Sequence, residues 1–154
     1  MDKKLVQELV DGAISENKEL FLIELNFLPG NKIYVEVDGD RGVSLSECIR
    51  ISRAVEHNLD RETEDFSLEV TSPDVAKPLK VKRQYIKNIN RKLTVKLTNN
   101  TTIEGDLIKV NDNEIELEWK AREPKPIGKG KITVIKNAVI AFNDIVEAKV
   151  KIIF

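Results

Sequence analysis

The stretch Ser72-Pro73-Asp74-Val75-Ala76-Lys77-Pro78-Leu79 interrupts the periodic apolar patterns of this 154-residue chain. Each proline lacks an amide donor and restricts the residue before it, so neither a helix nor a central strand runs through the stretch. Two prolines so close together make a stiff connector. We therefore expect two small domains, at residues 1–72 and 80–154, joined by a linker at residues 73–79, with structural roles for Ser72, Pro73 and Pro78.

Acidic and basic residues separate on the two sides of this linker, although the whole chain has a net charge of -1. Residues 1–76 contain 8 Lys and Arg against 17 Asp and Glu, a net charge of -9, and residues 77–154 contain 17 against 9, a net charge of +8. A basic surface is the electrostatic footprint of a protein that binds a polyanion. The alternative is that charge simply keeps both halves in solution, and the asymmetry alone names no partner.

The first half has the pattern of an α-β-β-α-β domain. Apolar residues recur at helical spacing over residues 3–17, and two alternating segments at 21–27 and 33–37 flank a turn, which predicts a β-hairpin. A third alternating segment follows at 66–70. Because strand, helix and strand in succession form a crossover unit, we expect the second and third strands to be parallel.

The second predicted helix begins at a capping box. Ser44 and Glu47 have the spacing at which each side chain satisfies a free amide of the other residue. The helical spacing after them predicts a buried stripe. Its expected members are Leu45, Cys48, Ile49, Ser52, Val55 and Leu59.

The second half is typical of a small β-barrel. After a short helical turn at 83–89, strand patterns occur at 93–97, 103–107, 115–119, 131–135 and 146–154, the last with Val146, Ala148, Val150, Ile152 and Phe154 on one face. In the second strand, the apolar phase switches after Leu107, and Gly105 removes a side chain just before the switch, which favours a sharp bend. The fold class expected for the chain is α+β, with a C-terminal Sm-like or SH3-like five-stranded β-barrel.

The residues that carry most enzyme chemistry are scarce. The chain has one histidine, His57, and one cysteine, Cys48, which we expect to be solvated and buried respectively, on different faces of one helix. Asp38-Gly39-Asp40 starts like a calcium loop, but Ile49 stands where the motif needs glutamate. We therefore predict no catalytic, cofactor or metal site. A nuclease that uses Asp38 and Asp40 is the enzyme alternative.

Two basic clusters are the positive functional signal. The first surrounds the linker and the entrance to the barrel, and the second crowds a loop that contains Pro and Gly. They comprise Lys77, Lys80, Lys82, Arg83, Lys87, Arg91 and Lys92, and Lys120, Arg122, Lys125, Lys129 and Lys131. Only Tyr85 and Trp119 are aromatic near these runs, and Trp119 continues an apolar face that fits the core better than a stacking platform. The pattern favours binding of RNA through shape and backbone.

Residues 38–69 resemble the signature stretch of the RimP family of ribosome maturation factors. The matching segments are Gly42-Val43-Ser44, Cys48, Ser52-Arg53-Ala54-Val55 and Leu59-Asp60 in the second helix, Leu68-Glu69-Val70-Thr71-Ser72-Pro73 and Pro78-Leu79 between the domains, and Gly105 and Ile145-Val146-Glu147-Ala148-Lys149-Val150 in the barrel. The chain departs from the family pattern at Asp74, Ala76, Lys77 and Asn90, where the family usually has Gly, Asp, Arg and Gly. Lys77 lacks the bidentate fork of arginine, and Asn90 tolerates a left-handed turn.

The resemblance implies an α/β N-terminal domain, an Sm-like C-terminal barrel and a role in assembly of the small (30S) ribosomal subunit. It further implies contact with ribosomal RNA and with the small-subunit protein of the decoding region, the twelfth in the usual numbering. We accordingly expect a monomer that binds the pre-30S particle without catalysis or cofactor. The alternative is an Sm-like RNA chaperone that acts on free RNA as a ring with open barrel edges.

The sequence gives no sign of a membrane partner. No apolar run approaches the about 18 residues that span a bilayer, and the start of the chain lacks the apolar stretch of a signal peptide. We therefore expect a cytoplasmic protein.

Overall fold

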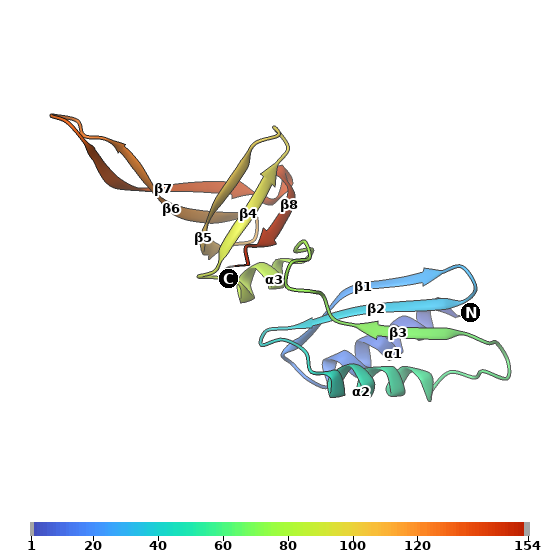
Figure 1. Ribbon diagram of the computed structural model, residues 1–154. Helices are drawn as coiled ribbons and strands as arrows, with labels where there is room; N and C mark the ends of the chain where they lie inside the picture. The colour runs from blue at the N-terminus through green and yellow to red at the C-terminus, as the bar shows by residue number, and fades with distance from the viewer. Residues whose placement is uncertain (1, 153–154) are drawn as a thin grey trace. The chain divides into compact units, whose positions relative to one another are not determined.

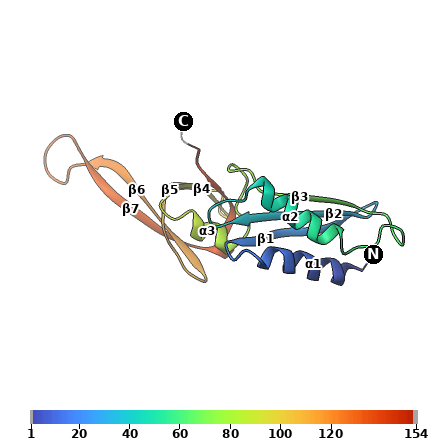
Figure 2. The same ribbon diagram turned by 90° about the horizontal axis from the view of Figure 1, so that it is seen from below.

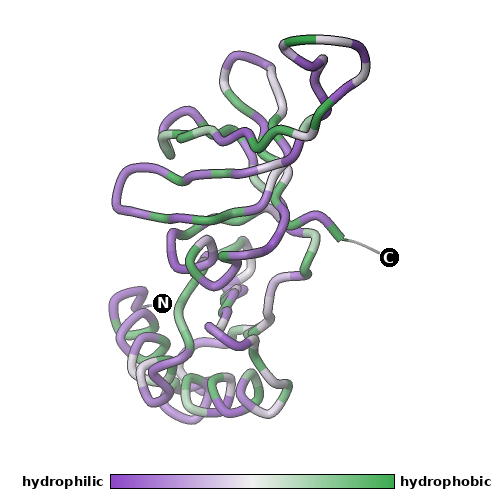
Figure 3. Tube along the Cα trace, turned by 90° about the vertical axis from the view of Figure 1, so that its left-hand side faces the viewer, coloured by the Kyte–Doolittle hydropathy of each residue, from purple (hydrophilic) through white to green (hydrophobic). Residues whose placement is uncertain are grey.

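A computed structural model describes residues 2–152 as a mixed α+β protein that divides after Asp74 into two compact units (Figure 1). Hydrophilic and hydrophobic residues are interspersed along the chain of both units (Figure 3). The N-terminal unit contains α1 (Lys3–Ser15), β1 (Leu20–Leu28), β2 (Lys32–Gly39), α2 (Leu45–Glu56) and β3 (Ser67–Thr71). The C-terminal unit contains α3 (Lys82–Lys87), β4 (Lys92–Leu97), β5 (Thr102–Val110), β6 (Glu114–Pro124), β7 (Lys131–Ala141), the 3₁₀ turn η1 (Phe142–Asp144) and β8 (Ile145–Val150).

The N-terminal unit is a three-stranded sheet covered on one face by two helices. The strand order is β1-β2-β3, and the predicted antiparallel hairpin and parallel β2–β3 pair are both confirmed. Figure 2 shows α1 and α2 side by side on one face of this sheet. The core between the helices and the sheet includes Val6, Val10, Ile33, Val35 and Ile51, all fully buried.

The α2 helix begins as predicted, but its buried stripe runs in a different phase. The Ser44 hydroxyl accepts a hydrogen bond from the Glu47 amide at 3.2 Å. Leu45 and Ile49, both expected in the stripe, are 77% and 41% exposed, whereas Ile51 is fully buried with Val55. Ile49 and Ile51 lie about 100° and 60° to opposite sides of Cys48 around the helix. The helical spacing is therefore compatible with either Ile49 or Ile51 in the buried stripe beside Cys48. Packing against the sheet places Ile51 there.

A hydrogen-bonded cluster ties the end of α1 to the start of α2. Arg50 donates to the Ala13 carbonyl and to Glu16, each at 2.8 Å, and also binds both oxygens of Glu47 at 3.3 and 3.0 Å. The hydrogen bonds from Arg50 hold the pKa of Glu47 below its ordinary value against the opposing effect of burial, with help from Asn17. The Glu47 carboxylate thus accepts hydrogen bonds from Arg50 and Asn17, and does not bind back to the Ser44 amide as a capping box requires.

The C-terminal unit is built on a five-stranded antiparallel sheet with the order β7-β6-β5-β4-β8. All five predicted strands are present. Leu93, Val95, Leu107 and Leu117 are fully buried at the centre of its core, which the ring of Tyr85 from α3 completes.

The predicted irregularity of β5 is confirmed. The pairing of β5 with β6 shifts register between Leu107 and Lys109, where the apolar phase switches. Gly105 is buried beside this point, and a Cβ atom there would lie 2.9 Å from the Glu118 carbonyl oxygen and 3.2 Å from the Trp119 ring. The absence of a side chain therefore lets β5 approach β6 closely.

The last strand is less regular than its sequence suggests. Lys96 of β4 pairs with Glu147 of β8, and the next residue of β4, Leu97, pairs with Ile145. Val146 therefore has no pairing partner on β4, and its side chain is 58% exposed. Ile152 follows the end of β8 and is 42% exposed. The prediction that Val146 lies on the same face of the strand as Ala148 and Val150 is therefore wrong, because the register shift turns the Val146 side chain outward. Phe154 lies outside the described residues.

The β6–β7 hairpin is longer than predicted. Its strands pair continuously from Glu114 with Ala141 to Pro124 with Lys131, whereas β5 pairs with β6 only as far as Glu118. Residues 119–136 therefore form a two-stranded ribbon with a loop at 125–130, which we call the arm. Figure 1 shows the arm extending away from the other strands of its unit.

Candidate functional site

The predicted basic residues fall into two groups within the C-terminal unit. The α3 cluster lies on α3, on the chain that leads into it and at the start of β4, and the arm cluster lies on the two strands and the loop of the arm. The α3 cluster is Lys77, Lys80, Lys82, Arg83, Lys87, Arg91 and Lys92, and the arm cluster is Lys120, Arg122, Lys125, Lys129 and Lys131.

Buried amides hold the backbone of the α3 cluster in place. The side-chain oxygen of Gln84 accepts from the amides of Lys80 and Val81, at 2.7 and 3.2 Å, and so caps the start of α3. The side chain of Asn88 donates to the Gln84 carbonyl at 2.7 Å and closes its end. Gln84 and Asn88 are 3% and 4% exposed, so their hydrogen bonds are shielded from water. These bonds hold the backbone of α3, and so the basic residues on it, in one conformation.

A left-handed turn then joins α3 to the sheet. Asn90 has φ of +77°, as its tolerance of that conformation predicted, and its amide donates to the Leu107 carbonyl at 2.7 Å. The Leu107 amide donates in return to the Arg91 carbonyl at 2.9 Å. These two bonds fix Arg91 and Lys92 against β5.

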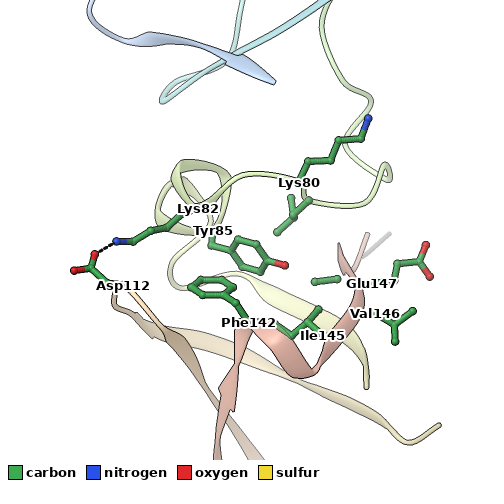
Figure 4. Close-up of a pocket in the computed structure, with 10 residues that line it drawn as sticks. Lys80, Lys82, Tyr85, Asp112, Phe142, Ile145, Val146 and Glu147 are labelled. Atoms are coloured by element: carbon green, nitrogen blue, oxygen red, sulfur yellow. Dashed lines mark hydrogen bonds and ion pairs between the residues drawn. The ribbon is translucent and has the colours of Figure 1, made fainter. Parts of the chain in front are cut away.

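A pocket of about 320 Å³ lies beside the α3 cluster and within the C-terminal unit (Figure 4). The rings of Tyr85 and Phe142 meet edge to face in its wall, with centroids 5.1 Å apart and planes at 73°. Burial raises the pKa of the Tyr85 hydroxyl, which favours its neutral form. The pocket is lined by Leu79, Lys80, Lys82, Tyr85, Asp112, Phe142, Ile145, Val146, Glu147 and Ala148.

Lys82 of the α3 cluster forms an ion pair at the rim of this pocket. The Lys82 ammonium forms a hydrogen-bonded ion pair with Asp112, drawn as a dashed line in Figure 4, and this hydrogen bond lowers the pKa of Asp112. The carboxylate is 89% exposed, so water screens the pair. The sequence did not indicate the pocket, because Phe142, which forms part of its wall, comes from a 3₁₀ turn that no motif marks.

The arm carries its charge unevenly between its two faces. Cross-strand pairing places Lys120, Arg122 and Lys131 on one face, which we call the outer face. The opposite, inner face carries Glu123 and Lys136, which form an ion pair with each other. Lys125 and Lys129 lie in the exposed loop at the tip.

The basic residues of the outer face and the tip differ from Lys136 in their partners. Within residues 2–152, none of Lys120, Lys125, Lys129 and Lys131 forms an ion pair. Arg122 donates to two neutral oxygens, Thr133 Oγ1 at 2.9 Å and the Lys131 carbonyl at 3.3 Å. The outer face and the tip of the arm therefore present positive charge that is not ion-paired within the described residues.

The groups considered for catalysis or metal binding are held in local structure. Cys48 is buried, as predicted, and burial raises the pKa of its thiol, while His57 is exposed at the end of α2. The carboxylate of Asp38 accepts from the Gly39 amide at 2.8 Å. No group of three or more His, Cys, Asp or Glu among the described residues could hold a metal ion.

No helix in the described part of the chain is long and apolar enough to cross a membrane.

Comparison with known proteins gives matches along the whole chain. The family model for the RimP N-terminal domain matches residues 9–75. A protein of Christiangramia forsetii named ribosome maturation factor RimP is 56% identical over 154 residues, which is 100% of both chains. Proteins with the same name from Flavobacterium psychrophilum and Porphyromonas gingivalis are 53% and 40% identical, over 99% and 96% of this chain and 98% and 97% of their own lengths.

Proposed function

Because the chain belongs to the RimP family of ribosome maturation factors, we propose that it binds the immature small (30S) ribosomal subunit and assists its assembly without catalysing a reaction. The observation that carries this proposal is the net charge of +8 on residues 77–154, in a chain that matches maturation factors from end to end. Ribosomal RNA is a polyanion, and a basic surface attracts it over a distance of about one Debye length.

The proposed contact surface is the α3 cluster together with the arm cluster. Both consist mainly of lysine, which binds phosphate as a point charge without reading the base sequence. The proposed partners are ribosomal RNA and the twelfth protein of the small subunit, and no cofactor takes part. The factor would act in the cytoplasm as a monomer, holding RNA or protein elements in a geometry that permits the next assembly step.

We also propose that the C-terminal sheet closes into an Sm-like barrel. β7 and β8 stand at opposite ends of the sheet order, yet only the three residues of η1 join them along the chain. So short a connection requires the sheet to curl until its ends approach, and the bend in β5 supplies curvature. In this proposal the two units are separate domains, and residues 73–79 are the linker.

The test is co-sedimentation of the purified full chain with free small subunits at low ionic strength. Alanine at Lys80, Lys82 and Arg83 should weaken binding by about tenfold or more, and wild-type binding should fall steeply with added salt because bound phosphates release counterions. A control triple variant with alanine at Lys4, Lys32 and Arg53 removes the same charge from exposed positions of the N-terminal unit. Equal binding by the two variants would contradict a role for the α3 cluster.

A further inference from the structure

The sign of the charge on one face of β6 reverses along the strand. Glu114, Glu116 and Glu118 alternate with buried residues where β6 lies within the sheet, and Lys120 and Arg122 continue the same face along the arm. A polyanion laid along this face would be repelled over the sheet and attracted beyond Glu118. The change of sign therefore confines any such contact to the arm.

The arm has the charge and shape of a binding element. Its 18 residues contain six Lys and Arg and one acid, a net charge of +5. The outer face holds three of these cations and the tip holds two, while the inner face is neutral overall because Glu123 pairs with Lys136. Ile127 at the tip and Ile135 on the outer face are 91% and 66% exposed, which adds apolar surface beside the charges.

The arm is not equipped for single-stranded nucleic acid, which proteins commonly bind by stacking bases on aromatic rings. Residues 120–136 contain no aromatic side chain. The ring of Trp119 lies at the base of the arm, where an added Cβ at Gly105 would lie 3.2 Å from it, so this ring packs over β5. The arm can therefore bind a nucleic acid through phosphate and sugar contacts instead of base stacking. Double-stranded RNA presents phosphates and sugars in a regular array along its wide, shallow minor groove.

We propose that the outer face and tip of the arm bind the sugar–phosphate backbone of an RNA double helix, independently of its base sequence. This inference rests on the proposed function for the biological source of the RNA, a helix of the small-subunit RNA. The two strands of the ribbon are about 5 Å apart, so the arm is narrow enough to lie in the wide, shallow minor groove of an RNA helix, where its lysines reach phosphates beside it.

The test uses the full chain with glutamine at Lys120, Lys125, Lys129 and Lys131, none of which forms an ion pair in the described part of the chain. The matched control has glutamine at Lys4, Lys32, Arg53 and Lys109, four exposed basic residues outside the arm. Binding to a 20-base-pair RNA duplex and to a single strand of equal length is measured by fluorescence anisotropy over a range of salt concentrations.

We expect the arm variant to bind the duplex at least tenfold more weakly than the control, with a slope of log K against log salt smaller by about one per lysine removed. Unchanged duplex binding by the arm variant would overturn the inference, and so would tighter wild-type binding to the single strand.

Co-sedimentation with small subunits separates this inference from the proposed function. If the arm variant loses subunit binding but keeps duplex binding, the arm contacts a ribosomal protein, and the inference fails while the proposed function stands. If the wild-type chain binds the duplex through the arm but ignores small subunits, the proposed function fails and the inference stands.

Discussion

Gly105 is the residue at which the missing side chain matters most for the C-terminal unit. An added Cβ would meet the Glu118 carbonyl oxygen at 2.9 Å, and backbone cannot rotate away as a flexible side chain can. The sequence indicated a special role for Gly105, because a glycine precedes a phase switch. The close approach that requires it involves β6 and is visible only in the folded chain.

We predict that Gly105→Ala lowers the free energy of unfolding of the C-terminal unit by about 1–3 kcal/mol, since overpacking must displace a strand. Gly12→Ala is the matched control, because a Cβ at Gly12 in α1 meets nothing within 4 Å. This control should raise stability by roughly 0.5–1 kcal/mol, as expected for alanine in a helix. Urea unfolding measures both changes, and a neutral Gly105→Ala would contradict the packing described for β5.

Glu47 predicts a pH dependence for the N-terminal unit. Hydrogen bonds from Arg50 lower its pKa below the ordinary value of 4.5, so the folded chain holds the carboxylate charged at pH values where the unfolded chain protonates it. The stabilisation is therefore complete above about pH 5 and is lost as the pH falls through the lowered pKa.

Glu47→Gln should destabilise the N-terminal unit by about 1 kcal/mol at pH 7, and the difference from wild type should shrink as the pH is lowered below 4.5. Glu8→Gln on the exposed face of α1 serves as the control and should change stability by less than about 0.5 kcal/mol. Chemical unfolding at a series of pH values checks this. A Glu47→Gln effect that persists undiminished at pH 3 would refute the assignment.

At the scale of elements, strands were easier to predict than the faces of helices. Alternation has a period of two, so the buried side of a regular strand follows directly from the sequence, as at Leu93 and Val95. In a helix of 12 residues with few apolar positions, more than one set of residues can form the buried stripe. In α2 the structure buries Ile51, where we expected Ile49. The arm was underestimated because its strands lack a core to impose strong apolar alternation.

The two isoleucines of α2 give a direct test of its orientation. Ile51→Ala should cost about 2–5 kcal/mol of N-terminal unit stability, because it leaves a cavity at a fully buried site. Ile49→Ala removes the same atoms from a side chain that is 41% exposed, and we expect a loss of less than about 1 kcal/mol. Thermal unfolding of both variants decides the matter, and the reverse order of stabilities would show that α2 packs through its other side.

At the scale of the whole molecule, the chain pairs an acidic unit with a basic one. Counting charges on each side of the linker indicated a polyanionic partner, and motif resemblance indicated the family to which the comparisons assign the chain. Sequence could not foresee that Lys120, Arg122 and Lys131 lie on one face of a projecting ribbon, because their grouping depends on cross-strand register. The contact residues within both clusters remain predictions.

Sedimentation of cell extract through a sucrose gradient, with the chain detected by antibody, tests the central claim most directly. Our account predicts that the protein travels with free small subunits at low ionic strength and leaves them as salt is raised, because charge holds it there. It predicts little of the protein in fractions of mature ribosomes. Accumulation at the top of the gradient at every salt concentration, or equal occupancy of mature ribosomes, would contradict the account.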